Sequence, residues 1–206
     1  MAPLFIVIEG TDGAGTTTQG DLLADALRAE GRRVVRTAQP SPGPIGQLLR
    51  TVLRDTSGQG ADPVAVALLF AADRVDHLQR VVEPALREGA VVVCDRYVGS
   101  SLAFQVVDGA GRIDAGWLLE INRGARVPDL SILLDVATET ALARIEHRGQ
   151  PHERFEVEAT LRAVRERYLA VFAAPPRLLG AAAVVDASRP VAAVAVDVLA
   201  AVRRVG

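Results

Sequence analysis

Lysine is missing from this sequence of 206 residues: all 23 residues counted together as lysine or arginine are arginine. The chain also carries 25 aspartate and glutamate residues, which leave a formal net charge of -2. This balance creates no overall positive field, so neither a nucleic acid nor a membrane surface is an expected partner. A small anionic ligand is compatible with the sequence where several arginines converge.

Cysteine and long apolar runs are scarce as well. The single cysteine, Cys94, excludes an internal disulfide framework and a metal site built from several cysteines, and it suits a reducing cytoplasm. The N-terminal apolar run 4–8 is too short for a signal peptide. Asp186, Arg189 and Asp197 interrupt the C-terminal stretch rich in alanine and valine, so no run approaches the ~20 apolar residues of a membrane span. We therefore expect a soluble, cytoplasmic protein.

Short apolar runs rich in valine and isoleucine alternate with longer helical patterns along the chain. The runs, read as strands, are 4–8, 34–35, 90–94, 130–134 and 182–185. Such alternation predicts an α/β fold of three layers, in which helices cover both faces of a parallel sheet. The length suits a single domain over residues 1–206.

The helical patterns differ in how clearly they end. The predicted helices are 17–30, 45–54, 64–87, 138–148 and 156–172. Pro84 is expected to kink or break the third of these, because proline removes a backbone donor. The last two helices are separated by a break with arginines near it, which predicts a small lid over about residues 144–156.

A glycine-rich turn from Gly10 to Thr17 follows the first predicted strand and opens the first predicted helix. In that context the pattern G-x-x-x-x-G-K-[ST] is typical of a loop whose N–H groups hold phosphate oxygens at a helix N-terminus. Thr17 holds the hydroxyl position that is expected to bind magnesium. Glycine-rich turns also occur in α/β proteins that bind no nucleotide. The residues predicted to bind ATP are Gly10, Gly13, Ala14, Gly15, Thr16, Thr17 and Thr18.

Thr16 occupies the position where this pattern has lysine. A hydroxyl group can donate a hydrogen bond to a phosphate oxygen, but it brings no positive charge to the transition state. The loss of one preorganised donor costs on the order of 10²- to 10³-fold in rate unless another cation substitutes. Because the chain has no lysine, only arginine or a metal ion can substitute.

Three further segments, 68–74, 95–105 and 144–156, share order and spacing with the thymidylate kinase family, as do 9–19 and 185–187. On these residues the chain resembles that family over nearly its whole length. The resemblance implies a P-loop NTPase-type fold with a five-stranded parallel sheet, a small helical lid and a homodimer. It also implies transfer of the γ-phosphoryl group from ATP to dTMP with Mg²⁺, giving dTDP and ADP.

The resemblance gives the nucleoside pocket to one helix and to the phosphate loop. It implies that Phe70 stacks on thymine and that Arg74 hydrogen-bonds the base, and their i, i+4 spacing puts both on one helix face. The other interpretation is a core phenylalanine and a solvated or ion-paired arginine. Asp12 is implied to accept a hydrogen bond from the sugar 3′-hydroxyl, or else it stabilises the loop.

Asp95 ends an apolar run, so we expect it at the carboxyl edge of a parallel strand, where ligands of open α/β sheets bind. A carboxylate associated with magnesium belongs there in a P-loop enzyme. The resemblance implies that Arg96 contacts the acceptor phosphate and that Ser100, Ser101 and Gln105 line the pyrimidine and sugar side. A structural Asp–Arg pair is the alternative.

Family members that have glycine beside the acidic loop residue, as Gly13 stands here, supply their catalytic arginine from the lid. Arg148 and Arg154 are the candidates, and they would reach the phosphoryl group only on closure. A charged surface helix is the other interpretation. The segment 37–40, Thr-Ala-Gln-Pro, departs from the family pattern Thr-Arg-Glu-Pro, so the chain has two departures near the reacting phosphates. They indicate either compensation or decay.

Two alternatives to dTMP phosphorylation stay open on these residues. One is a catalytically impaired nucleotide-binding relative, and the other is a kinase for another pyrimidine nucleoside monophosphate. A GTPase fits the sequence poorly, because the only asparagine, Asn122, is followed by arginine and an Asn-Lys-x-Asp guanine motif cannot exist.

Overall fold

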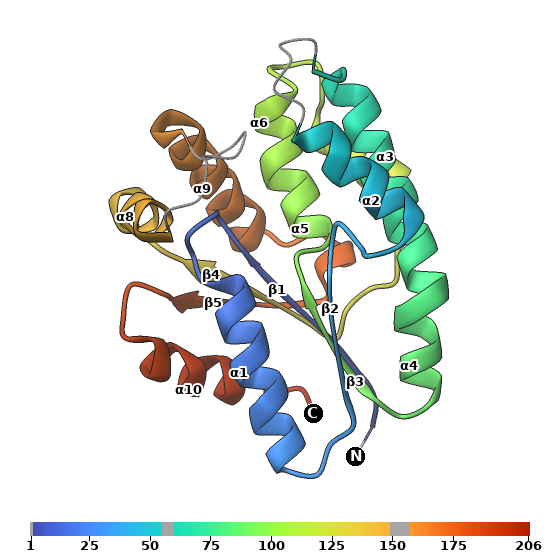
Figure 1. Ribbon diagram of the computed structural model, residues 1–206, viewed down its shortest axis with the longest axis vertical. Helices are drawn as coiled ribbons and strands as arrows, with labels where there is room; N and C mark the ends of the chain where they lie inside the picture. Colours follow the sequence, from blue (N-terminus) through green and yellow to red (C-terminus); the bar gives the residue numbers. More distant parts are fainter. Residues whose placement is uncertain (1, 55–59, 149–156) are drawn as a thin grey trace.

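A five-stranded parallel sheet lies at the centre of the computed structural model, which describes residues 2–54, 60–148 and 157–206 (Figure 1). The strand order is β2-β3-β1-β4-β5, and every neighbouring pair is parallel. This confirms the predicted fold class and the five predicted strands. The strands are β1 (Leu4–Gly10), β2 (Val34–Ala38), β3 (Val91–Asp95), β4 (Leu130–Asp135) and β5 (Ala181–Asp186).

Two hydrophobic cores, one on each face of the sheet, explain why the inner strands read as continuous apolar runs. Every residue of β1 and of β3 is buried. Along β1, Phe5 and Val7 enter one core while Ile6 and Ile8 enter the other, as the alternation of side chains along a strand requires. The edge strand β5 is mostly exposed.

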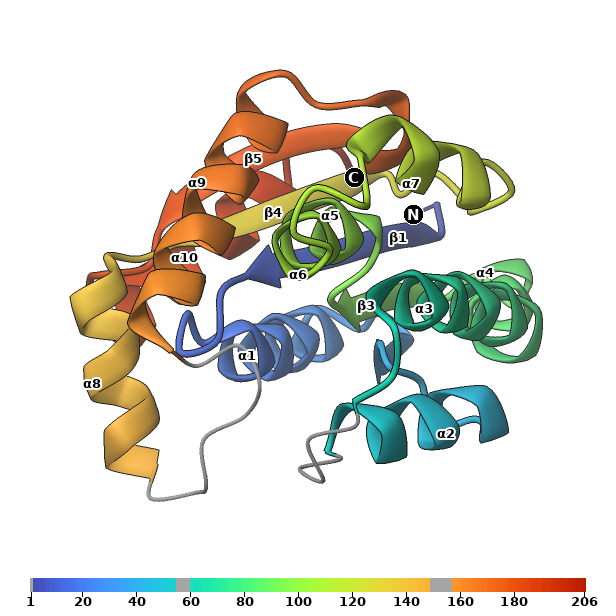
Figure 2. The ribbon, with the colours of Figure 1, turned by 90° about the horizontal axis from the view of Figure 1, so that it is seen from above.

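Helices form the two outer layers (Figures 1 and 2). On one face α1 (Thr16–Ala29) and α10 (Val191–Val202) pack together, and α8 (Thr138–Arg148) joins their core through Ala141. The other face is covered by α3 (Pro63–His77), α4 (Glu83–Arg87), α7 (Ala115–Ile121) and α9 (Glu158–Ala173). The helix α2 (Pro44–Leu53) packs on α3 from outside. Among the described residues no helix is both long and apolar enough to cross a membrane.

The predicted helices 17–30, 45–54, 138–148 and 156–172 are confirmed to within about two residues at the ends that the structure describes. The interruption expected at Pro84 takes the form of a π-helix, η1 (Leu78–Val82), between α3 and α4. A wider turn accommodates the missing N–H and the bulk of the proline ring while the chain stays helical.

Several helical segments were not predicted from the sequence. One runs without a break through α5 (Val98–Ser100), the π-helix η2 (Ser101–Gln105) and α6 (Val106–Asp108). The others are α7, α10 and the short 3₁₀ helix η3 (Arg177–Leu179). The start of α7 did carry a signal, since the Asp114 side chain accepts a hydrogen bond from the Trp117 N–H as an N-cap.

Candidate functional site

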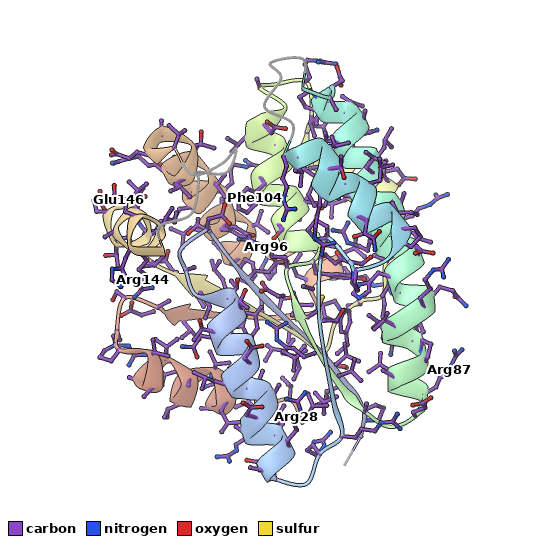
Figure 3. The ribbon with its side chains drawn as sticks, viewed as in Figure 1. Arg28, Arg87, Arg96, Phe104, Arg144 and Glu146 are labelled. Atoms are coloured by element: carbon purple, nitrogen blue, oxygen red, sulfur yellow. The ribbon has the colours of Figure 1, made fainter. Side chains whose placement is uncertain are left out.

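A cleft of about 560 Å³ opens at the carboxyl ends of β1 and β3. In Figure 3, Arg144 lies on the α8 side of the loop after β1, and Arg96 and Phe104 lie toward α5. The cleft therefore occupies the edge of the sheet where α/β proteins bind ligands. Its lining includes residues 11–19, Ala38, Gln39, Pro40, Arg50, Asp95, Arg96, Arg144, Ile145, Ala187, Arg189, Val191 and Val194.

The loop between β1 and α1 has the conformation of a phosphate cradle. Gly15 caps α1 with a left-handed φ of 91°, and no side chain caps the first-turn N–H groups. Those donors at the positive end of the helix dipole are free to receive phosphate oxygens. Gly13 has φ 78°, and a Cβ there would lie 2.4 Å from the Ala141 carbonyl oxygen. Glycine is thus required where the loop touches α8.

Thr17 and Asp95, the two predicted magnesium ligands, lie together. The Thr17 hydroxyl donates a hydrogen bond of 2.6 Å to Asp95 Oδ2. The other carboxylate oxygen of Asp95, Oδ1, is buried and has no hydrogen-bond partner among the described residues. Because a buried oxygen without a partner is costly, this atom fits a site for a cation.

Arg96 faces the phosphate loop from the end of β3. Its backbone has φ 66°, and its guanidinium donates to the Gly10 carbonyl oxygen at 2.7 Å and to Asp12 at 2.6 Å. The guanidinium also lies over the Phe104 ring, 5.0 Å from its centroid. Burial disfavours its charge, but the neighbouring groups, Asp12 first and then Tyr168, Asp95 and Glu9, together outweigh burial and raise the pKa of Arg96. Asp12 and Arg96 thus form an ion pair across the mouth of the loop.

Glu9 is a site residue that was not predicted from the sequence. It is buried at the end of β1 and accepts hydrogen bonds from the Tyr97 N–H at 3.0 Å, from Ser100 at 2.6 Å and from Tyr168 at 3.1 Å. Burial raises the pKa of Glu9, and the hydrogen bonds from Ser100 oppose this shift. Glu9 therefore connects β1 to α5 and α9 behind Arg96.

Arg74 is buried, so it is not solvated. Among the described residues, none of its hydrogen bonds goes to a carboxylate. Its guanidinium donates to Gln39 Oε1 at 3.1 Å, to Ser101 Oγ and the Tyr97 carbonyl oxygen at 3.0 Å, and to Asn122 Oδ1. Burial lowers the pKa of Arg74. The guanidinium is thus fixed in the interior by neutral oxygens.

The remaining predicted pocket residues differ in their surroundings. Phe70 is half-buried on α3, and Ser100 shares hydrogen bonds with Glu9 and Tyr168. Gln105 is buried, and its Oε1 has no hydrogen-bond partner among the described residues. That buried oxygen therefore has unused capacity to accept a hydrogen bond.

The segment 37–40 shows how the chain accommodates its departure from the family pattern. The Gln39 amide accepts from Arg74, and its Nε2 lies 3.2 Å from His77 Nδ1. His77 Nε2 in turn lies 2.7 Å from Thr37 Oγ1. The neutral amide satisfies both neighbours, so the position does not need the absent carboxylate to fill its hydrogen bonds.

Several arginines approach the cleft, and only some of them were predicted from the sequence. Arg144 donates to the carbonyl oxygens of Gly13 at 3.4 Å and Ala187 at 2.9 Å. Arg50 on α2 was missed, and it lines the cleft while donating to the Ser41 carbonyl oxygen at 2.6 Å. The predicted catalytic side chain of Arg148, all of Arg154 and the lid break lie outside the described residues.

The parallel sheet, the glycine-rich loop at the start of α1 and the Thr17–Asp95 pair together define a nucleotide-binding protein of the P-loop class. The family is set by comparison: the family model described as thymidylate kinase matches residues 8–198, so the chain belongs to the thymidylate kinase family.

Relatives agree with that assignment. A protein of Leifsonia xyli subsp. xyli named thymidylate kinase is 45% identical over 201 residues, covering 95% of this chain and 92% of that protein. One of Pelotomaculum thermopropionicum with the same name is 43% identical over 211 residues, covering 100% and 95%. A probable thymidylate kinase of Pyrococcus horikoshii is 43% identical over 172 residues, covering 82% of each chain.

Proposed function

We propose that the chain transfers the γ-phosphoryl group of ATP to dTMP, giving dTDP and ADP. The observation that carries the proposal is the hydrogen bond of 2.6 Å between Thr17 and Asp95, which lies beside the glycine-rich loop and the uncapped N-terminus of α1. The family supplies the acceptor, since relatives that match along nearly their full length are named thymidylate kinase.

Magnesium is the proposed metal ion, and Thr17 and Asp95 are the residues that would hold it. Hydroxyl and carboxylate oxygens suit Mg²⁺, which takes most of its other ligands from water and phosphate. In agreement, the described part of the chain contains no group of three or more His, Cys, Asp and Glu residues able to hold a metal ion. When bound, the ion offsets charge on the phosphate oxygens.

The protein's own contribution is position and charge, because phosphoryl transfer between nucleotides needs no covalent intermediate. The N–H groups from Gly13 to Thr18 hold the ATP phosphates. Arg96 exchanges Asp12 for the acceptor phosphate, which releases the carboxylate toward the sugar 3′-hydroxyl. A lid arginine, Arg148 or Arg154, reaches the phosphoryl group when the lid closes, and the closure excludes water.

The nucleoside half of dTMP is proposed to lie against α3 and η2. Phe70 stacks on the base, and Arg74, Ser101 and Gln105 present polar groups to its edge, with Ser100 toward the sugar. The unpartnered Oε1 of Gln105 supports this placement, since a base N–H would complete its hydrogen bonding.

A product assay with Mg²⁺, ATP and each pyrimidine nucleoside monophosphate tests the function. We expect dTDP from dTMP and a loss on the order of 10²-fold or more in kcat/KM for dTMP in R96A, because a preorganised cation is removed. R123A is the matched control, since Arg123 is 80% exposed and pairs with Glu120, which is also exposed. No dTDP at saturating substrates, with both nucleotides bound, would contradict the proposal.

Thr16 motivates the second candidate, a nucleotide-binding relative that has lost transfer. T16K separates the two. A nearly inert wild type that T16K activates on the order of 10²-fold or more favours decay of the active site. A working wild type that gains little favours compensation by other cations.

We also propose a homodimer in the cytoplasm. Ala65, Leu68, Ala72 and Val75 form an exposed apolar stripe along α3, with Leu68 47% and Val75 60% exposed. A continuous stripe at helical spacing suits a helix of a second copy. We expect sedimentation to give a dimer that L68E/V75E converts to a monomer. V196E, at a residue 66% exposed on α10, is the control that stays dimeric.

A further inference from the structure

Arg36 on β2 brings a guanidinium to the rear of the phosphate loop. Its Nη2 donates to the Thr17 carbonyl oxygen at 3.3 Å and lies 3.5 Å from Asp95 Oδ2, the oxygen that also accepts from the Thr17 hydroxyl. The Arg36 side chain is 17% exposed and that of Asp95 is 10% exposed. Because water is largely excluded, this charge acts more strongly on its surroundings than a surface arginine does.

The fold makes room for Arg36 in particular. A Cβ on Gly20, inside α1, would lie 2.3 Å from Arg36 Nη2. Glycine is disfavoured within a helix, yet here it opens a notch that admits the guanidinium. Nε is held by Asp21 at 3.0 Å and Nη1 by the Thr37 carbonyl oxygen at 2.6 Å. The guanidinium is therefore fixed from several sides.

The formal charges at the loop point to a reason for this arrangement. Thr16 leaves the loop one positive charge short, and the charge of Arg96 is matched by Asp12. Arg36 is shared between two carboxylates, the buried Asp95 at 3.5 Å and the more exposed Asp21 on α1 at 3.0 Å. A loop with lysine at position 16 and no charge at position 36 would have the same formal sum.

We propose that Arg36 is a positioning residue that supplies, through Asp95 and the Thr17 turn, the positive charge that Thr16 does not. It lies outside the lining of the cleft. The inference rests on the proposed function for its kinetic readout, and nucleotide binding tests it independently of turnover.

A double-mutant cycle of R36Q and T16K is the test. We expect R36Q to lower kcat about 10- to 100-fold, the range for residues that hold a ligand of a metal, with little change in KM for dTMP. In the T16K background the same change is expected to cost less than about threefold, because the two charges substitute for one another. An equal cost of R36Q in both backgrounds would overturn the proposal.

The second readout is ATP affinity measured in EDTA, where no metal ion contributes. R36Q is expected to weaken binding about three- to tenfold through the lost charge, and T16K to restore it. If the wild type makes no dTDP, the proposed function fails while this measurement still decides the role of Arg36. Unchanged affinity in R36Q would overturn the role.

Three further variants separate charge from packing. R33Q changes an arginine that lies three residues before Arg36 and forms an exposed ion pair with Glu88. This variant is expected to leave kcat and ATP affinity unchanged. R36K keeps the charge and is expected to stay within about threefold of wild type in ATP affinity. R36M keeps the apolar stem and is expected to behave as R36Q. A loss in R36K equal to that in R36Q, or a failure of both neutral variants to fold, would assign Arg36 to packing.

Discussion

His77 shows how a single buried side chain is held in one protonation state. Arg74 donates to the Gln39 amide oxygen, so the amide NH₂ of Gln39 is turned toward His77 Nδ1, which must accept. The imidazole proton therefore lies on Nε2, which donates to Thr37. A second proton would face the NH₂ group of Gln39, and burial likewise lowers the pKa of His77 below its ordinary 6.5.

This arrangement predicts a pH dependence of stability. Since the folded pKa of His77 is lowered, the unfolded chain binds more protons below pH 6.5, and the free energy of unfolding falls as the pH drops from about 7 to about 5. Chemical denaturation across that range is expected to show a smaller fall in H77Q. The control H147Q changes an exposed histidine on α8 and is expected to follow the wild type. An identical slope in H77Q and wild type would show that His77 does not carry the effect.

Some functional residues could be named from the sequence, and others could not. Thr17, Asp95 and Arg96 follow a strand in sequence, so their places at the sheet edge were predictable. Glu9 and Arg36 were not, because their roles depend on contacts with residues as distant as Tyr168 and Asp95. No local pattern encodes such a pairing.

Among the helices and strands, the pattern of burial explains which ones could be predicted from the sequence. The inner strands are apolar up to their carboxyl ends because both faces are covered, and such runs are easy to recognise. All five residues of η2 are buried and include polar ones, so no amphipathic period marks them. The helix α10 has almost no polar side chain, which likewise hides its period.

The contact between the phosphate loop and α8 yields a prediction with an internal control. G13A adds a Cβ 2.4 Å from the Ala141 carbonyl oxygen at φ 78°, so we expect α8 or the loop to shift and KM for ATP to rise about tenfold or more. G31A has the same φ of 78° but nothing within 4 Å of its Cβ. Both variants pay for backbone strain, about 1–2 kcal/mol in unfolding measurements, whereas only G13A is expected to change KM. An equal KM in both would contradict the contact.

At the scale of the whole molecule, the cleft gathers groups from α1, β2, α2, β3, α8 and the start of α10. Ligand binding therefore links parts that are far apart in the sequence. ATP with Mg²⁺ at 100 times its Kd is expected to raise the free energy of unfolding by about 2.7 kcal/mol. Thermal unfolding with and without nucleotide measures the shift. In D95N, most of the stabilisation that depends on magnesium is expected to be lost. A shift as large as that of the wild type would show that Asp95 does not contribute to the metal site.

The ion pair between Arg96 and Asp12 has a consequence for how dTMP is received. The guanidinium is already immobilised by Gly10 and by the Phe104 ring before any phosphate arrives. Little rotamer freedom is left to lose, so capture of the monophosphate is an exchange of one anion for another. Calorimetry is expected to register dTMP binding as a modest release of heat with a small entropic penalty, and the heat released is expected to grow in D12N, where no carboxylate has to be displaced.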